Sequence, residues 1–177
     1  MAVIDADAHV IETEHTWDHM RDEDQEFRPL SVETTNAEGP RRAFWLIGGR
    51  AGGRAFARNT STDTGTSDAS RELTDVQARL AHMDELGVDI QVLYPTLFLR
   101  PLSARPEVDY ALSRGYNRWM AEIWKLGQGR LRWPVIAPVH HLDKAIEEVH
   151  FGKEHGACGV YLRAGEAGLS LVDPYFY

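Results

Sequence analysis

The fold is decided by residues 76–94, VQARLAHMDELGVDIQVLY, where one glycine separates a helical pattern from a strand pattern. Spacings of three and four residues, typical of a helix face, separate the apolar side chains Leu73, Val76, Leu80 and Met83. Gly87 stands where the C-terminal cap of that helix is expected. Residues 88–94 then favour a strand, which Pro95 ends.

The same alternation continues on both sides of this unit. Strands are expected at 2–8, 133–139 and 158–162, and helices at 106–127 and 145–156. Alternating strands and helices favour a parallel α/β sheet, either doubly wound or part of a (β/α) barrel. A complete eight-stranded barrel needs about 250 residues. Four strands in 177 residues therefore correspond to the N-terminal half of a (β/α)8 TIM barrel.

We expect one incomplete domain over residues 1–177, with a loop-rich insertion after the first strand at about 29–72. Residues 12–28 are acidic and predict a short helix or an ordered loop. Within the insertion, the aromatic run Phe44-Trp45-Leu46-Ile47 indicates a short strand or hairpin, and the polar run 59–67 has no periodicity.

Composition excludes several classes of protein. The chain is 43% hydrophobic and 26% charged, which indicates a globular domain and not a disordered polyelectrolyte. Residues 1–28 hold nine carboxylates against two arginines, so most of the net charge of −8 lies there. With no basic stripe, nucleic-acid binding is not expected. With neither a long apolar run nor a signal-peptide pattern, and with Cys158 the only cysteine, we expect a cytoplasmic protein without a membrane partner.

The richest cluster of chemically active residues is at the N-terminus. On an extended strand, Asp5, Asp7 and His9 share one face, with Asp7 and His9 at its C-terminal end. A carboxylate and an imidazole two residues apart suit a divalent ion, with Glu12 as a third ligand or an outer hydrogen-bond acceptor. The spacing alone favours the alternative, in which Asp7 and His9 bond only each other and cap the loop, because short Asp-x-His matches are common.

Residues 4–12, IDADAHVIE, resemble the opening of the amidohydrolase-related family of metal-dependent TIM barrels. That family includes aminocarboxymuconate semialdehyde decarboxylase and the hydroxybenzoate decarboxylases. The similarity continues through residues 79–96, 130–138, 159–163 and 171–177, and omits residues 13–70.

The resemblance implies a metal-binding pair at Asp7 and His9, in the variant that carries an acid in the first position. Zinc is the metal it implies first, with manganese or iron as alternatives for a carboxylate-rich site. The family's further ligands lie on strands five and eight, beyond this half. The resemblance therefore implies a missing C-terminal half, supplied by a complementary half-barrel chain or by a homo-oligomer, which would also cover the exposed strand edges.

Three other residues follow predicted strands. His141 is a candidate general base or substrate ligand, and the alternative is a loop histidine near the following helix. Arg163 suits a substrate carboxylate or, equally, a structural salt bridge. Tyr94 either lines the pocket or only packs.

Three functions remain open from the sequence. The first is a metal-dependent hydrolase acting on a small carboxylate-type substrate. The second is a metal-dependent non-oxidative decarboxylase of an aromatic or unsaturated carboxylic acid. The third is a non-catalytic half-barrel subunit. The fold alone does not choose among them.

Overall fold

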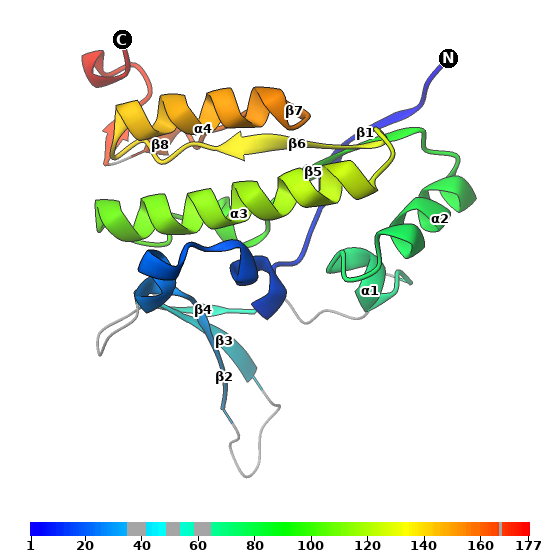
Figure 1. Ribbon diagram of the computed structural model, residues 1–177, viewed down its shortest axis with the longest axis horizontal. Helices are drawn as coiled ribbons and strands as arrows, with labels where there is room; N and C mark the ends of the chain where they lie inside the picture. Colours follow the sequence, from blue (N-terminus) through cyan, green and yellow to red (C-terminus); the bar gives the residue numbers. More distant parts are fainter. Residues whose placement is uncertain (35–41, 49–53, 59–64, 167) are drawn as a thin grey trace.

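Four parallel strands form the central sheet of the computed structural model, which describes residues 1–34, 42–48, 54–58, 65–166 and 168–177. The strands lie in the order β1-β5-β6-β7 (Figure 1), with bounds β1 Ile4–His9, β5 Ile90–Tyr94, β6 Leu131–Ile136 and β7 Ala157–Tyr161. Neighbouring strands in space are also consecutive parallel strands in the chain, as the sequence predicts. The two termini lie at opposite ends of the molecule.

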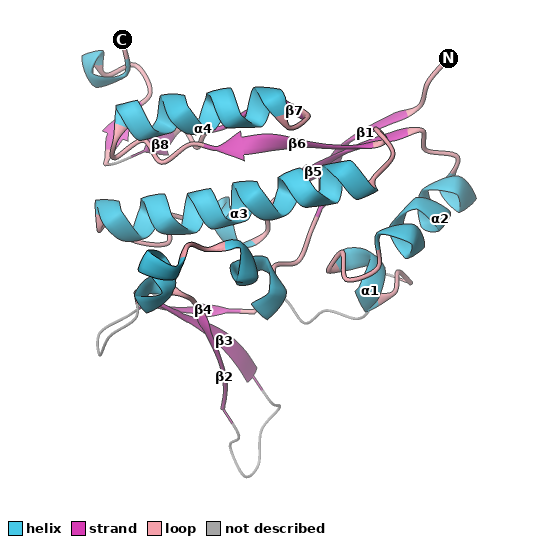
Figure 2. Ribbon diagram, in the orientation of Figure 1, coloured by secondary structure: helices cyan, strands magenta, loops and turns pink. Residues whose placement is uncertain are grey.

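All the crossover helices pack on one face of this sheet. The helices are α1 (Asp68–Arg71), α2 (Val76–Leu86), α3 (Pro106–Leu126) and α4 (Leu142–Glu154), and α3 and α4 run along β6 (Figure 2). On β5, the side chain of Gln91 accepts a hydrogen bond from Arg79 of α2. Leu131, which pairs with Gln91 on the neighbouring strand β6, contacts the C-terminal end of α3. Val135, on the same face as Leu131, contacts α4. A doubly wound sheet has helices on both faces, so the structure confirms half a barrel.

Close packing on the helical face requires a glycine in α4. A Cβ on Gly152 would lie 2.1 Å from Val135 Cγ2, so only glycine lets α4 approach β6 this closely. On β5, Gln91 and Leu93 face the helices and are buried, whereas Ile90, Val92 and Tyr94 are only half-buried. Ile90, Val92 and Tyr94 therefore face the side of the sheet that would be the interior of a complete barrel.

The insertion contains a small antiparallel sheet. Its strands are β2 (Leu30–Thr34), β3 (Arg42–Ile47) and β4 (Arg54–Ala57), with β3 in the middle. The strand expected at residues 44–47 is therefore confirmed, and Trp45 packs edge-on against Trp17 at 6.2 Å between ring centroids. The stretches 35–41, 49–53 and 59–64, which include most of the polar run, lie outside the described residues.

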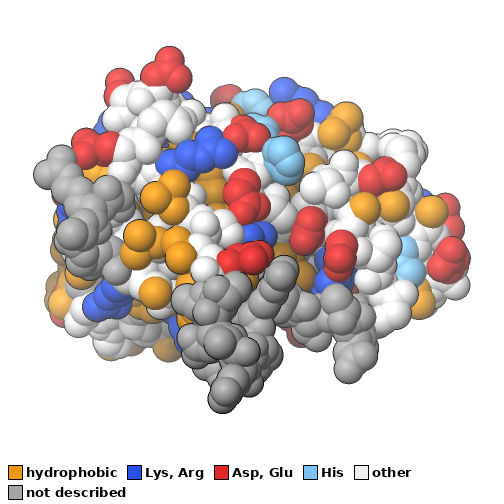
Figure 3. Space-filling view, turned by 90° about the horizontal axis from the view of Figure 1, so that it is seen from below, with side chains coloured by type: hydrophobic (Ala, Val, Ile, Leu, Met, Phe, Trp, Pro, Cys, Tyr) orange, Lys and Arg blue, Asp and Glu red, His pale blue; other side chains and the backbone are white. Residues whose placement is uncertain are grey.

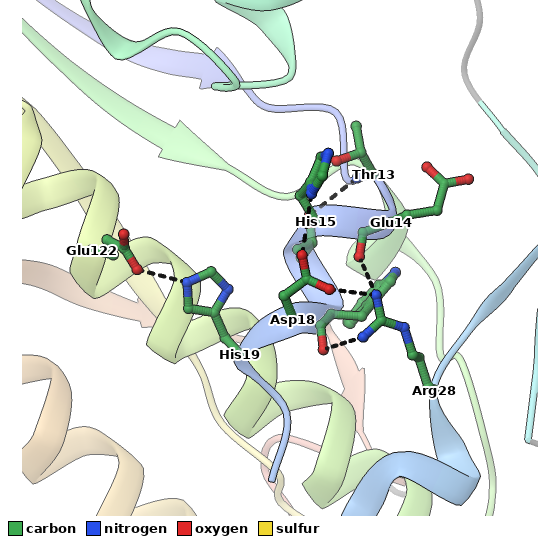
Figure 4. Close-up of polar contacts among 9 residues, drawn as sticks. Thr13, Glu14, His15, Asp18, His19, Arg28 and Glu122 are labelled. Atoms are coloured by element: carbon green, nitrogen blue, oxygen red, sulfur yellow. Dashed lines mark hydrogen bonds and ion pairs between the residues drawn. The ribbon is translucent and has the colours of Figure 1, made fainter. Parts of the chain in front are cut away.

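The acidic segment 12–28 is ordered as two 3-10 helices, Glu14–His19 and Asp22–Phe27. Figure 4 shows how Arg28 fastens the first of them, donating to Asp18 Oδ1 at 2.6 Å and to the Glu14 carbonyl at 2.9 Å. The hydrogen bond from Arg28 is the main reason why the pKa of the Asp18 carboxyl is lowered. His19 reaches α3, with Nε2 2.8 Å from Glu122 Oε2.

Surface charge in this region is mixed. From below, Figure 3 shows lysine and arginine side chains scattered among acidic ones, and the described part of this face has no basic stripe. Among the described residues, no helix combines the length and apolarity needed to cross a bilayer.

The chain after β7 forms a short hairpin, β8 (Gly165–Glu166) with β9 (Leu169–Ser170), and a 3-10 turn at Pro174–Phe176. An apolar groove of about 610 Å³ lies between this segment and α4. Its walls include Ile146 and Val160, which are 58% and 43% exposed. This outer side of β7 lacks a covering helix in the described structure.

Several expected boundaries are wrong: β1 and β5 begin at residues 4 and 90 instead of 2 and 88, and α4 begins at 142 instead of 145. Two further differences have a local cause. Leu73 does not belong to the helix: it lies between α1 and α2 and has a left-handed φ of 54°. Helix α2 begins only after Asp75, whose carboxylate caps it by accepting a hydrogen bond from the Ala78 amide. The strand expected at 133–139 occupies 131–136, since Pro138 has no amide proton for a strand ladder. Gly87 caps α2 with φ 67°, as predicted.

A buried carboxylate joins α3, α4 and β6. Glu148, only 2% exposed, accepts two hydrogen bonds from Arg118 at 2.8 and 2.9 Å and one from Asn117 at 2.9 Å. Asn117 also bonds both the carbonyl and the amide of Ile136, at 3.0 Å each. These contacts fix the end of β6 against two helices.

We expect Glu148→Ala to lower the free energy of unfolding by about 3 kcal/mol, because Arg118 and Asn117 lose their common acceptor in a buried position. Chemical denaturation followed by tryptophan fluorescence measures the change. Glu147→Ala, which removes an exposed ion pair with Lys144 on the same helix, is the control and should leave the unfolding midpoint nearly unchanged. Equal effects of the two substitutions would contradict the assignment.

Candidate metal-binding site

A β-bulge in β1 determines which side chains reach the open face of the sheet. Asp5 pairs with Gln91 and Ala8 pairs with Leu93, so β1 has one residue more than β5 between these pairs. The bulge places Asp5 on the helical face with Gln91, whose Nε2 donates to Asp5 Oδ2 at 2.9 Å. The expectation that Asp5 shares a face with His9 is therefore wrong, because one extra residue reverses the alternation.

Asp7 and His9 lie together at the carboxyl end of β1. His9 Nε2 is 3.8 Å from Asp7 Oδ1, and 93% of the Asp7 side chain is exposed. The other ring nitrogen of His9, Nδ1, is 3.2 Å from the Pro95 carbonyl, which can only accept. Nδ1 therefore carries a proton, and Nε2 is the ring nitrogen that faces the Asp7 carboxylate. Metal-binding histidines are typically held in this way.

Glu12 is turned away from this pair. It is 3% exposed, and its carboxylate accepts from the backbone amides of Thr96 and Leu97 at 3.0–3.1 Å. Burial raises the pKa of Glu12 to about 7, outweighing the amide hydrogen bonds that lower it. Within the described residues, no group of three His, Cys, Asp or Glu side chains is arranged to hold a metal ion. The structure thus brings together two of the three predicted ligands.

Aromatic rings continue the surface from His9 across the sheet. The ring of Tyr94, at the end of β5, lies 6.1 Å from the His9 ring and 6.1 Å from that of Tyr161 at the end of β7. Tyr94 therefore stands directly beside the Asp7–His9 pair. Tyr161 was not singled out by the sequence, although its place at the end of a strand is the same signal that marks Tyr94.

A cavity of about 760 Å³, lined by apolar and by charged residues, lies at the carboxyl ends of β6 and β7. Its lining includes Arg54, Ser103, Asp109, His140, Arg163 and Glu166. Arg163 donates to Glu166 at 2.5 Å and to the Phe98 carbonyl at 2.8 Å, so it forms the salt bridge that the sequence left as one alternative. Burial raises the pKa of Asp109 to about 6, although the charge of Arg163 acts in the opposite direction.

His141 lies outside the lining of this cavity. It occupies the N-cap position of α4, where its carbonyl accepts from the Ala145 amide at 2.9 Å, and its side chain is exposed. His140, its neighbour, lines the cavity. Asp109 and Glu166 carry no strand-end signal in the sequence, because one lies inside a helix and the other in a hairpin, so sequence reasoning missed both.

The raised pKa of Glu12 predicts a specific pH dependence of stability. Glu12 holds its proton more tightly in the folded chain than at its ordinary pKa of 4.5, so its neutral carboxyl contributes stability that is complete below about pH 4.5 and is lost as the pH rises to about 7. Between pH 5 and 7.5, the free energy of unfolding should therefore fall by roughly 2 kcal/mol less in Glu12→Gln than in the wild type. Asp109 titrates in both proteins, so the difference reports Glu12. Parallel pH profiles from denaturant titrations would contradict this.

The comparisons with known proteins agree with this architecture. No family model and no curated protein matches the sequence. Among solved structures, the chain is similar to an amidohydrolase from Mycobacterium avium subsp. paratuberculosis K-10, with a TM-score of 0.68 and 20% identity. The match covers 98% of this chain and 53% of that chain, so this chain spans about half the length of the amidohydrolase. At this identity the likeness establishes the fold: half of a (β/α)8 barrel of the kind that the amidohydrolase has.

Proposed function

We propose that this chain supplies the first metal-binding half of a metal-dependent hydrolase of the amidohydrolase superfamily. The observation that carries the proposal is the Asp7–His9 pair at the carboxyl end of β1. Active sites of (β/α) barrels are built at this end of the strands. The fold of a solved amidohydrolase supports the same function.

The donor set fits part of a metal centre. Asp7 offers exposed carboxylate oxygens, and His9 offers Nε2 while Nδ1 is held by the Pro95 carbonyl. Zinc is the metal we propose first, with manganese or iron suited to a site richer in carboxylates. When bound, such an ion supplies Lewis acidity that lowers the pKa of a coordinated water to about 7. We propose that Glu12 holds the loop at Thr96 and Leu97 and is not itself a ligand.

Two protein ligands are too few for a catalytic zinc site, which usually has three. We therefore propose that the remaining ligands come from a complementary half-barrel, or from a second copy of this chain. The exposed edge at β7 and the groove beside it are where such a half would continue the sheet.

The tyrosines and the cavity at the ends of β6 and β7 suggest where a small carboxylate-type substrate lies. Tyr94 would contact a substrate bound at the Asp7–His9 pair, and Arg163 would hold its distal polar end. His140 lines the same cavity, and we propose that His140 or the adjacent His141 carries protons to and from the substrate. Substitution of each histidine separately would identify which one acts.

The alternative is a non-oxidative decarboxylase of an aromatic or unsaturated carboxylic acid, for which we propose the same cavity. Arg54 and Arg163 line it together with Asp109 and Glu166, and the two arginines would suit the carboxylate of either kind of substrate. Release of carbon dioxide in a product assay would distinguish a decarboxylase from a hydrolase.

The other alternative is a non-catalytic subunit, in which the apolar groove beside β7 would serve only to pair with another chain. The signature of that role would be a stable oligomer that binds no metal.

The proposed ligand pair is tested by zinc titration of the chain after treatment with a chelator. We expect His9→Ala and Asp7→Ala each to weaken zinc binding at least about tenfold, because each removes one of two ligands. Isothermal titration calorimetry measures the dissociation constant.

The control is His15→Ala. His15 and Asp18 form an exposed pair at 3.1 Å, closer together than Asp7 and His9 but away from the strand ends. Its substitution should leave zinc binding unchanged. Zinc binding that survives in His9→Ala and is lost in His15→Ala would refute the site.

A further inference from the structure

A buried arginine lies behind the Asp7–His9 pair, on the opposite face of β1. Arg79, from α2, is 6% exposed and occupies the space between α2 and the β1–β5 ladder. Its Nε donates to Gln91 Oε1 at 2.7 Å, its Nη1 to the Ser70 carbonyl at 3.4 Å and its Nη2 to the His9 carbonyl at 3.3 Å. One guanidinium therefore links α1, α2, β5 and the residue whose imidazole faces the other side.

The network also reaches Asp7. Gln91, 4% exposed, donates through Nε2 to Asp5 Oδ2, and the second oxygen of Asp5 accepts from the Asp7 amide at 3.1 Å. The carboxylate of Asp5 thus spans the bulge. Starting from Arg79, one branch of hydrogen bonds ends on the backbone of His9 and the other on the backbone of Asp7.

This arrangement does more than fasten a helix to a sheet. A cation buried without a direct carboxylate partner is costly, and an apolar side chain would pack α2 on β5 at lower cost. The planar guanidinium offers donors in several fixed directions, and a lysine cannot reproduce that geometry. Its donors here meet acceptors at the bulge, where the direction of Asp7 and His9 is set.

We propose that Arg79 is the positioning residue of the Asp7–His9 pair, acting through Gln91 and Asp5 to hold the bulged backbone that turns both side chains to the open face. The inference rests on the proposed function, since it concerns the same pair of ligands. Arg79 touches neither side chain of the pair, so it acts only through the backbone.

The test compares Arg79→Lys with the wild type by two measurements on folded chain. The first is the zinc dissociation constant, which should rise about tenfold. The second needs no metal: nitrogen-15 spectra of the His9 ring in the zinc-free chain. The wild type should show the tautomer protonated at Nδ1, and Arg79→Lys should show a mixture of tautomers, because β1 shifts relative to the Pro95 carbonyl.

Arg130→Lys is the matched control. Arg130 also donates to backbone carbonyls of the α2–β5 connection, those of Val88 and Asp89, at 2.8 and 3.0 Å, but at the opposite end of β5. Arg130 is more exposed than Arg79 and also pairs with Asp84 Oδ1 at 2.7 Å, so the unfolding midpoint of each variant is measured as well. Positioning predicts that zinc binding and the ring signals stay unchanged in Arg130→Lys even where its stability falls. If Arg79→Lys does not fold, Asp5→Ala replaces it, because Asp5 is only partly buried and its loss breaks the branch to Asp7.

The outcomes separate the two proposals. If the wild type binds zinc through His9 and the folded variants bind it equally well with unchanged ring signals, positioning by Arg79 is overturned and the metal site stands. If the wild type alone binds zinc too weakly to measure, because the ligands of the other half are absent, the ring signals alone decide: a mixture of tautomers in Arg79→Lys supports positioning, and an unchanged ring overturns it.

Discussion

The carboxylate of Glu148 is the interaction on which the outer layer of this half-barrel depends. A buried charge is tolerated only when it is paired and hydrogen-bonded, and here Arg118 and Asn117 supply both conditions. Because Asn117 also bonds both backbone groups of Ile136, the same cluster fixes the point where β6 ends. The chain that follows, including His140, therefore leaves the sheet at a defined position above the cavity at the ends of β6 and β7.

A second constraint acts at β1. A regular strand would point Asp5 and His9 the same way, and the bulge separates them. On the helical face, the Asp5 carboxylate accepts a hydrogen bond from the backbone amide of Asp7. The side chains of Asp7 and His9 face the open side of the sheet. Bulges are common beside active sites because they redirect a side chain without disturbing the rest of the sheet. β7 has a bulge as well, between Ala157 and Gly159. What distinguishes the bulge of β1 is the pair of side chains, Asp7 and His9, that it turns to the open face.

Much of the fold was predictable because it depends on local chemistry. Gly87 and Pro95 mark the ends of α2 and β5, and the strand–helix alternation predicts the order of the parallel strands. The bulge was not predictable, because the side chains that contact it belong to elements far apart in sequence: Asp5 accepts from Gln91, 86 residues away, and Gln91 accepts from Arg79. The place of Glu12 was not predictable either, because it also depends on residues far away in the sequence. Its spacing from His9 suits a metal ligand, but its carboxylate accepts hydrogen bonds from the amides of Thr96 and Leu97.

The salt bridge between Arg163 and Glu166 is a local contact that the sequence allowed but did not decide. A strand-end arginine suits substrate binding, yet Glu166 follows three residues later and bonds it within the β8–β9 hairpin. Both residues line the cavity, but most donors of the Arg163 guanidinium are taken: Nη1 donates to the Phe98 and Arg100 carbonyls at 2.8 and 3.4 Å, and Nε is buried. Nη2, which donates to Glu166, carries a second N–H, and the salt bridge fixes its direction. If Arg163 binds a carboxylate-type substrate as we propose, the substrate would meet a donor that is already oriented, so little side-chain entropy would be lost on binding.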